Sequence, residues 1–99
     1  MAYEIKFAES VKAQLKALTA RERGKVLAAI QAQLVHEPLR ETRNRKLLRP
    51  NPVAPWELRL GKLRVFYDVA DDEPKRVYIV AIGEKRGNRL VIEGKEIKL

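Results

Sequence analysis

Two alternating runs joined by Gly61-Lys62 constrain the fold of this chain more than any other part of its sequence. Residues 56–60 and 63–69 have the period of strands, and a two-residue loop that starts with glycine is typical of a type II′ hairpin turn. Such a turn sets the register, so Arg59 should lie opposite Arg64. One face of this hairpin is then apolar and must cover a core, and it carries Trp56, Leu58, Leu60, Leu63, Val65 and Tyr67.

A third strand is predicted over residues 76–82. Its stretch from Val77 to Ile82 is apolar on both faces, which is typical of a strand in the middle of a sheet. Residues 89–99 hold the apolar run Leu90-Val91-Ile92, then a glycine and a second alternation, so short extended pieces are expected there. The second half of the chain therefore predicts a three-stranded antiparallel sheet.

The first half predicts one strand and two helices. Residues 3–7 alternate like a strand, and apolar residues then recur at helical spacing from Ser10 onward. Thr19 and Glu22 fit a capping box that starts a second helix, and Pro38 ends it. We expect an antiparallel helical hairpin over residues 10–35. The fold class is thus α+β, with an N-terminal strand, an antiparallel two-helix hairpin and the three-stranded sheet in a single domain, residues 1–99.

The connection over residues 40–55 has no periodic pattern. It carries five cations and three prolines, and the cations are Arg40, Arg43, Arg45, Lys46 and Arg49. Structureless connections of this length are uncommon inside compact domains. The segment is therefore expected to be functional, mobile or both.

Composition excludes several classes of protein. The 99 residues include 21 Lys plus Arg, 13 Asp plus Glu, one His and no Cys, for a formal charge of +8. Structural zinc sites and cysteine nucleophiles cannot be built from this set, and the scattered glycines form no phosphate loop. We expect no metal and no cofactor. The sequence has no apolar run long enough for a membrane span and no secretory signal, so a cytoplasmic protein is expected.

The predicted pairing of Arg59 with Arg64 is unusual, because like charges directly opposite each other destabilise a sheet. Glu57 and Phe66 share the face of these two arginines. One interpretation is that an anionic ligand sits there. The other is that the guanidiniums splay into solvent, or that Glu57 and Asp68 neutralise them.

Further cations lie near this pair in the predicted fold. Residues 40–64 hold eight Lys or Arg against two Glu, a local charge of +6, and a basic loop follows the third strand. Arginine suits phosphate because its planar fork donates in pairs. The candidate RNA-binding residues are Arg43, Arg45, Lys46, Arg49, Lys62, Phe66 and Arg89. Phe66 could stack on an unpaired base, or it could be covered by the C-terminal segment.

The order of these pieces resembles the RelE/ParE toxin superfamily of bacterial type II toxin-antitoxin systems. The resemblance rests on residues 56–61, 63–67 and 80–85, read as Trp-Glu-Leu-Arg-Leu-Gly, Leu-Arg-Val-Phe-Tyr and Val-Ala-Ile-Gly-Glu-Lys. It implies a RelE-like microbial RNase-type fold and a cytoplasmic toxin held inactive by a cognate antitoxin in a hetero-oligomer. For the RelE branch it implies a ribosome-dependent endoribonuclease that cuts translated mRNA without a metal.

The resemblance also implies catalytic roles. Arg64 would stabilise the charge that grows on the phosphate, and Arg59 and either Lys85 or Arg86 would bind phosphate or stabilise the leaving group. Glu57 falls where the RelE pattern has a lysine, and it could act as a base or as a partner of the arginines. The tyrosine or histidine usual near the C-terminus of RelE-type enzymes is replaced by Leu90-Val91-Ile92.

Two other functions stay open at this point. One is a ParE-like inhibitor of DNA gyrase, which binds a protein and carries out no chemistry. The other is a catalytically weak basic relative that binds nucleic acid. In the toxin interpretations, an antitoxin segment should lie along apolar surface beside the helices and sheet, with acidic residues over the basic face.

Overall fold

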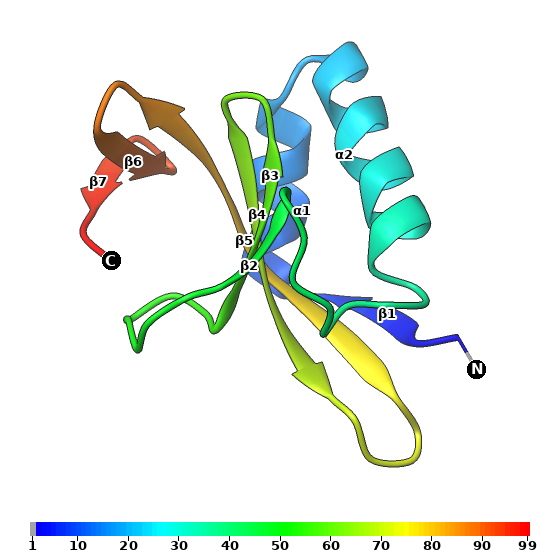
Figure 1. The fold of residues 1–99 in the computed structure, drawn as a ribbon. Coiled ribbons are helices and arrows are strands. Elements are labelled where there is room, and N and C mark those ends of the chain that lie inside the picture. The colour runs from blue at the N-terminus through cyan, green and yellow to red at the C-terminus, as the bar shows by residue number, and fades with distance from the viewer. Residues whose placement is uncertain (1) are drawn as a thin grey trace.

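The structure is a computed structural model that describes residues 2–99, in which two helices pack on one face of a single curved sheet (Figure 1). The elements follow the order β1 (Glu4–Phe7), α1 (Glu9–Ala17), α2 (Ala20–Gln33), β2 (Arg45–Leu47), β3 (Trp56–Leu60), β4 (Leu63–Ala70), β5 (Arg76–Arg86), β6 (Arg89–Ile92) and β7 (Lys95–Ile97). The predicted α+β class is confirmed. Neither helix within residues 2–99 is long and apolar enough to cross a membrane.

The sheet has seven strands, so the prediction of a three-stranded antiparallel sheet was wrong in size. Six strands follow the order β2-β3-β4-β5-β6-β7, and β1 pairs with β5 in parallel. The three predicted strands form the centre, and β5 has neighbours on both sides. The added strands have three or four residues and lie outside this centre, and alternation over so few residues is too brief to predict pairing.

The central hairpin has the predicted register. Leu60 pairs with Leu63, Arg59 with Arg64 and Trp56 with Tyr67. Gly61 at the turn has φ of +59°, and Lys62 after it does not take a positive φ. A positive φ at the first turn position, without one at the second, is typical of a type II′ turn. Glycine adopts a positive φ without strain, which explains why Gly61 stands at the first position.

The helical hairpin is fastened by two sets of contacts. Thr19 Oγ1 accepts from Glu22 N at 3.1 Å and Glu22 Oε1 accepts from Thr19 N at 3.0 Å, which confirms the capping box. Arg23 then reaches back from α2 and donates to the carbonyls of Leu15 and Leu18 at 2.9 and 3.1 Å. These bonds tie the start of α2 to the last turn of α1, where helical hydrogen bonds run out.

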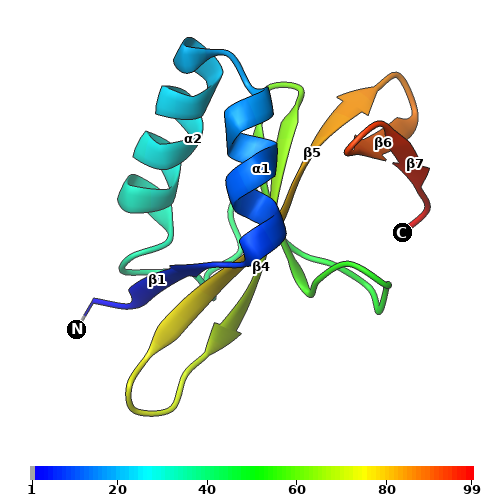
Figure 2. The same ribbon diagram turned by 180° about the vertical axis from the view of Figure 1, so that it is seen from behind.

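The two faces of the sheet bury different clusters, and Figure 2 shows the helices over one of these faces. The helices cover the main core, which takes its sheet residues from Leu58, Val65, Tyr67, Val77, Ile79 and their neighbours. The opposite face carries a smaller core of Ala54, Phe66, Ala81 and Leu90. The apolar face predicted for the β3–β4 hairpin thus packs against the helices. The opposite face of the hairpin is also partly covered.

The connection over residues 40–55 is more ordered than predicted. It contains β2, which pairs with β3 as an edge strand. The loop after it closes around Asn51, whose amide nitrogen donates to the carbonyls of Arg49 and Ala54 at 2.8 and 2.9 Å. Its oxygen accepts from Val53 N and Ala54 N at 2.8 and 3.1 Å. The side-chain hydrogen bonds of Asn51 therefore order this loop, although its sequence lacks the periodic pattern on which the prediction depended.

Candidate binding face

Cations from four strands share the sheet face opposite the helices. Lys46 pairs with Glu57, and Arg59 pairs with Arg64, so all four side chains alternate away from the helix core. Lys85 lies two residues beyond Gly83, the partner of Arg64, and joins the same face. We call this surface the basic face, defined by Lys46, Glu57, Arg59, Arg64 and Lys85.

A carboxylate bridges the two opposed arginines. Glu57 is 5% exposed, and its Oε1 accepts from Arg59 Nε at 2.8 Å. Its Oε2 lies 3.8 Å from Arg64 Nε. Asp68, the other candidate partner, is exposed and accepts from the backbone N of Val69 at 2.8 Å. Glu57 therefore relieves the like-charge repulsion inside the chain.

Arg64 is hydrogen-bonded to the turn of the β3–β4 hairpin. Its Nη1 donates to the carbonyls of Gly61 and Leu63 at 2.5 and 2.9 Å, and its side chain is 14% exposed. Burial lowers the pKa of the Arg64 guanidinium, Glu57 raises it in part and Arg59 lowers it. Arg59 keeps 47% of its side chain exposed. Of the two opposed arginines, Arg59 is thus the one that an external partner can reach.

Lys85 and Arg86, the two candidate residues at the end of β5, lie on opposite faces of the sheet. Arg86 alternates to the helix side, where its Nε donates to Glu84 Oε1 at 2.8 Å. This bond lowers the pKa of the Glu84 carboxyl, with a smaller contribution from Lys62. Lys85 therefore joins Arg59 and Arg64, and Arg86 does not.

Two predicted RNA-binding residues are buried, and these assignments need correction. Phe66 has no exposed surface, because the smaller core encloses its ring, so it cannot stack on a base in this conformation. Arg45 is 9% exposed and donates to the carbonyls of Arg40 and Gln33 at 3.0 and 2.5 Å. Arg45 thus holds the end of α2 to the following loop, as basic groups do at helix C-termini.

The other predicted RNA-binding cations lie at the margins. Arg43 and Arg49 are exposed on the two loops that flank β2. Lys62 projects from the hairpin turn toward Glu22 and Glu84, at 3.9 and 3.8 Å. Arg89 Nη1 lies 3.7 Å from Glu96 Oε1. Arg43 and Arg49 thus flank the strand that carries Lys46, whereas Lys62 is turned toward the helix side by its carboxylate partners.

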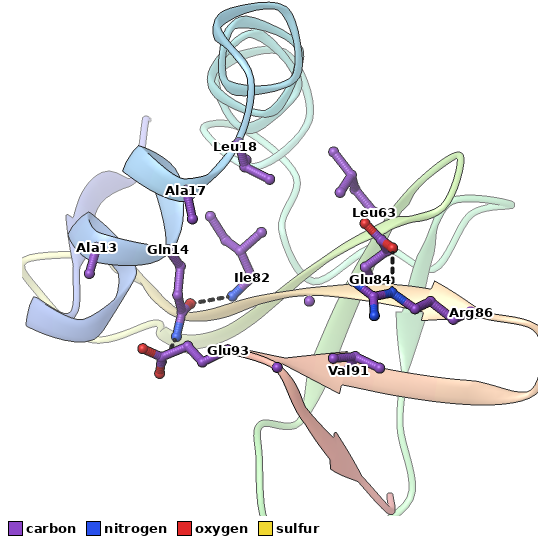
Figure 3. Close-up of a pocket in the computed structure, with 12 residues that line it drawn as sticks. Ala13, Gln14, Ala17, Leu18, Leu63, Ile82, Glu84, Arg86, Val91 and Glu93 are labelled. Carbon is purple, nitrogen blue, oxygen red and sulfur yellow. Dashed lines mark hydrogen bonds and ion pairs between the residues drawn. The ribbon is translucent and has the colours of Figure 1, made fainter.

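A hollow that the sequence did not reveal lies on the helix side (Figure 3). The cavity has a volume of about 360 Å³ between α1 and the end of β5. At its base, Gln14 Oε1 accepts from Ile82 N at 2.7 Å, and Gln14 Nε2 donates to Glu93 Oε2 at 3.1 Å. Gln14 lies among the residues that carry the apolar stripe of α1. A polar residue at such a position is the one sequence signal that could have pointed to this hollow.

Gln14 fills a gap along one edge of β5. The partners of β5 on this edge are β1 as far as Ile79 and β6 from Glu84 onward. The amide N–H of Ile82 falls between them and is satisfied by the side chain of α1. Gln14 is therefore a structural link among α1, β5 and the β6–β7 turn.

The chemistry available on the basic face is that of charge and hydrogen-bond donors. No cluster of His, Cys, Asp and Glu within residues 2–99 is arranged to hold a metal ion. The carboxylate of Glu57 is committed to two guanidiniums, and His36 lies exposed beyond α2. The face can bind an anionic or acidic surface through Arg59, Lys85 and the flanking cations.

Comparisons with known proteins agree with this fold. The family described as ParE toxin of type II toxin-antitoxin system, parDE, matches residues 5–89. Among solved structures, the toxin-antitoxin complex RelBE2 from Mycobacterium tuberculosis has a chain 26% identical to this one, with a TM-score of 0.72. That match covers 86% of this chain and 100% of the other. No curated protein sequence matches this chain.

Proposed function

Because this chain belongs to the ParE toxin family of type II toxin-antitoxin systems, within the RelE/ParE superfamily, we propose that it is a toxin that acts by binding. Its target is DNA gyrase, as in the ParE-like alternative above, and it inhibits gyrase without cutting RNA. The basic face, with Arg59 as its most accessible guanidinium, contacts the target. The toxin acts in the cytoplasm, and a cognate antitoxin holds it inactive in a hetero-oligomer.

The observation that carries this proposal is the position of Glu57 between the two arginines. Glu57 Oε1 accepts from Arg59 at 2.8 Å, while Arg64 Nη1 is occupied by two backbone carbonyls. A phosphate-cleaving site needs donors aimed at the position where charge develops. Here Nη1 of Arg64 holds the hairpin turn and Nε lies 3.8 Å from Glu57, so the cluster favours a rigid binding surface over a cleavage site.

The groups that would transfer protons support the same proposal. Metal-free RNA cleavage requires a group that takes the proton of the ribose 2′-OH. The carboxylate on the basic face is Glu57, which is 5% exposed and shared by two arginines. Leu90, in the region where RelE-type enzymes have an aromatic or histidine, packs into the smaller core. Neither position offers an accessible base.

A second candidate is a RelE-like endoribonuclease that cuts mRNA on the ribosome. The specific observation in its favour is that Arg59, Arg64 and Lys85 share one face, as the resemblance to the RelE branch requires. In this version the three cations stabilise phosphate charge, and positioning replaces general-base catalysis. The missing proton transfer would make cleavage slower by about a hundred-fold to ten-thousand-fold.

Induced expression in a bacterial host separates the candidates. Our proposal predicts growth arrest with plasmid DNA that loses negative supercoils and with mRNA ends unchanged. Arg59→Ala should relieve the arrest, and Arg21→Ala on the exposed side of α2 is the matched control. Codon-linked mRNA cuts that disappear with Arg59→Ala would favour the endoribonuclease. No effect on growth would leave a basic relative that binds nucleic acid.

A further inference from the structure

The hollow between α1 and the end of β5 has the size of a small-ligand site. Its volume of about 360 Å³ lies within the range of such sites, which is about 300–1,000 Å³. Small residues leave this room, because two alanines of α1 and two glycines stand in its walls, namely Ala13, Ala17, Gly83 and Gly94. We call this feature the α1 hollow, and its defining residues are Ala13, Gln14, Ala17, Ile82, Val91 and Glu93.

The walls of the α1 hollow are held in place by close contacts on both sides. A Cβ atom on Gly83 would lie 2.9 Å from Ile92 Cγ1 and 3.0 Å from Leu90 Cδ1, so glycine lets β6 approach β5 closely at this point. On the α1 side, Gln14 Oε1 accepts from Ile82 N at 2.7 Å and joins the helix to the strand. The hollow is therefore formed before a ligand binds, which lowers the entropic cost of binding.

The interior of the α1 hollow is mainly hydrocarbon. Leu18, Ile82 and Val91 line it. The side-chain amide of Gln14 is bonded on both atoms, because its oxygen accepts from Ile82 N and its nitrogen donates to Glu93 Oε2. The interior thus favours an aliphatic group over a polar one.

Two carboxylates stand at the rim of the hollow, and they differ in their partners. Figure 3 shows them apart from each other, with Glu93 beneath Gln14. Glu84 is already neutralised, because Arg86 Nε donates to it at 2.8 Å and Lys62 Nζ lies 3.8 Å away. Glu93 accepts from Gln14 Nε2 at 3.1 Å, and within residues 2–99 no Lys or Arg forms an ion pair with it. Glu93 is thus the rim carboxylate that can receive an external cation.

The backbone at Glu93 supports the same conclusion. Glu93 and Gly94 join β6 to β7 with φ of +51° and +77°. Two positive φ values in a two-residue loop are typical of a type I′ turn, which favours Asn, Asp or Gly at its first position. Glutamate takes this conformation with strain. Strained residues cluster at binding sites, so a carboxylate that serves a ligand explains the glutamate better than the turn does.

We infer that the α1 hollow binds a primary alkylammonium ion, with its ammonium group on Glu93 and its aliphatic stem against Ile82 and Val91. The chain as a whole has a formal charge of +8 and repels cations, so an amine gathers here only through the local carboxylate. A free amine and a lysine side chain of another protein share this chemistry, and the experiment below separates the two sources. The inference does not depend on the proposed toxic action.

NMR titration of the full chain at neutral pH and constant ionic strength tests the inference. The probe is n-butylamine, followed through the amide resonances of Ile82 and Glu93. Butyrate carries the opposite charge on an aliphatic stem, and a lysine capped at both ends stands for a protein side chain. Glu93→Gln removes the charge and keeps an acceptor for Gln14, and Ala17→Leu fills the hollow from α1. Glu41→Gln makes the same charge change on an exposed loop residue outside the hollow.

We expect saturable binding of n-butylamine with a dissociation constant on the order of 1 mM, and no saturation with butyrate. Glu93→Gln should weaken binding about tenfold or more, Ala17→Leu should abolish it, and Glu41→Gln should leave it unchanged. Absence of saturation, an equal response to butyrate, or equal weakening by Glu41→Gln would overturn the inference. Tighter binding of the capped lysine would assign the ammonium to a protein partner, and tighter binding of n-butylamine would assign it to a free amine.

Glu93→Asn separates a binding role from a structural one. Asparagine is favoured at a positive φ, so this variant should unfold at the same temperature as the unchanged protein or higher, and it should lose amine binding. A clear loss of thermal stability with amine binding retained would mean that Glu93 serves the turn, and it would overturn the inference. Thermal unfolding also checks that the other variants are folded. Because gyrase is absent from these assays, failure here leaves the proposed toxic action to its own test.

Discussion

Glu57 Oε1 accepts a hydrogen bond from Arg59 Nε at 2.8 Å while the Glu57 side chain is almost fully enclosed by the sheet. The opposed arginines of the central hairpin thus carry their own counter-ion. The pair that suggested an external anion is part of a closed ionic cluster, and Arg64 completes that cluster through the hairpin turn.

Removal of the Glu57 charge should destabilise the fold. Glu57→Gln leaves two guanidiniums opposite each other with no carboxylate between them, so we expect a loss of about 1–3 kcal/mol in the free energy of unfolding. Urea denaturation gives the value. Arg21→Ala on the exposed side of α2 is the control, and its cost should stay below about 0.5 kcal/mol. A Glu57→Gln variant as stable as the unchanged protein would contradict the closed cluster.

Phe66 should behave as a core residue. Its ring has no exposed surface, so Phe66→Ala is expected to cost about 3–5 kcal/mol. Leu47→Ala, at a side chain that is 54% exposed, should change stability by less than about 0.5 kcal/mol. Thermal or chemical unfolding of both variants checks this. Near-normal stability of Phe66→Ala would mean that the ring is available to a ligand after all.

Gln14 should protect one amide at the edge of β5. Gln14→Ala leaves the N–H of Ile82 without its partner, at an expected cost of about 1–3 kcal/mol. Amide hydrogen exchange at Ile82 should become faster, while exchange in the paired part of β5 near Ile79 follows only the global change. Lys16→Ala on the exposed side of α1 is the control and should leave both rates unchanged. Equal exchange at Ile82 in all three proteins would rule out the link.

The Glu84 carboxyl predicts a dependence of stability on acid. Its pKa lies below the ordinary value of 4.5, first because Arg86 donates to it and then because Lys62 is near. A lowered pKa in the folded state means stability that is present above pH 4.5 and lost as the pH falls through the folded pKa. Arg86→Ala should raise the pKa of Glu84 and flatten that acid loss. NMR titration of the Glu84 carboxyl carbon measures the shift, and an unchanged titration curve would refute the assigned cause.

The parts of the fold that follow from local rules could be predicted from the sequence. The register of β3 and β4 follows from the turn at Gly61, and the start of α2 follows from Thr19 and Glu22. The parallel pairing of β1 with β5 joins residues about seventy positions apart, which no local pattern encodes. The strands at the two ends of the sheet, β2 and β7, have three residues each and are too short for a clear alternation.

The sequence predicts which sheet face the residues of the candidate site share, but it does not predict which side chains contact one another. Alternation places Glu57, Arg59 and Arg64 together, as the structure does. It cannot say that Leu90 from the C-terminal hairpin would enclose Phe66, because that cover comes from a distant segment. It also left open whether Glu57 serves as base or counter-ion, a choice that depends on a distance of 2.8 Å to Arg59.

The most direct test of the central claim is a supercoiling assay with purified toxin, DNA gyrase, ATP and relaxed plasmid, run beside a translation reaction that reports mRNA ends. We predict that the toxin inhibits supercoiling, that Arg59→Ala weakens this inhibition while Arg21→Ala does not, and that the mRNA stays intact. Unimpaired supercoiling together with mRNA cuts that depend on Arg59 would contradict it and make the basic face a cleavage site.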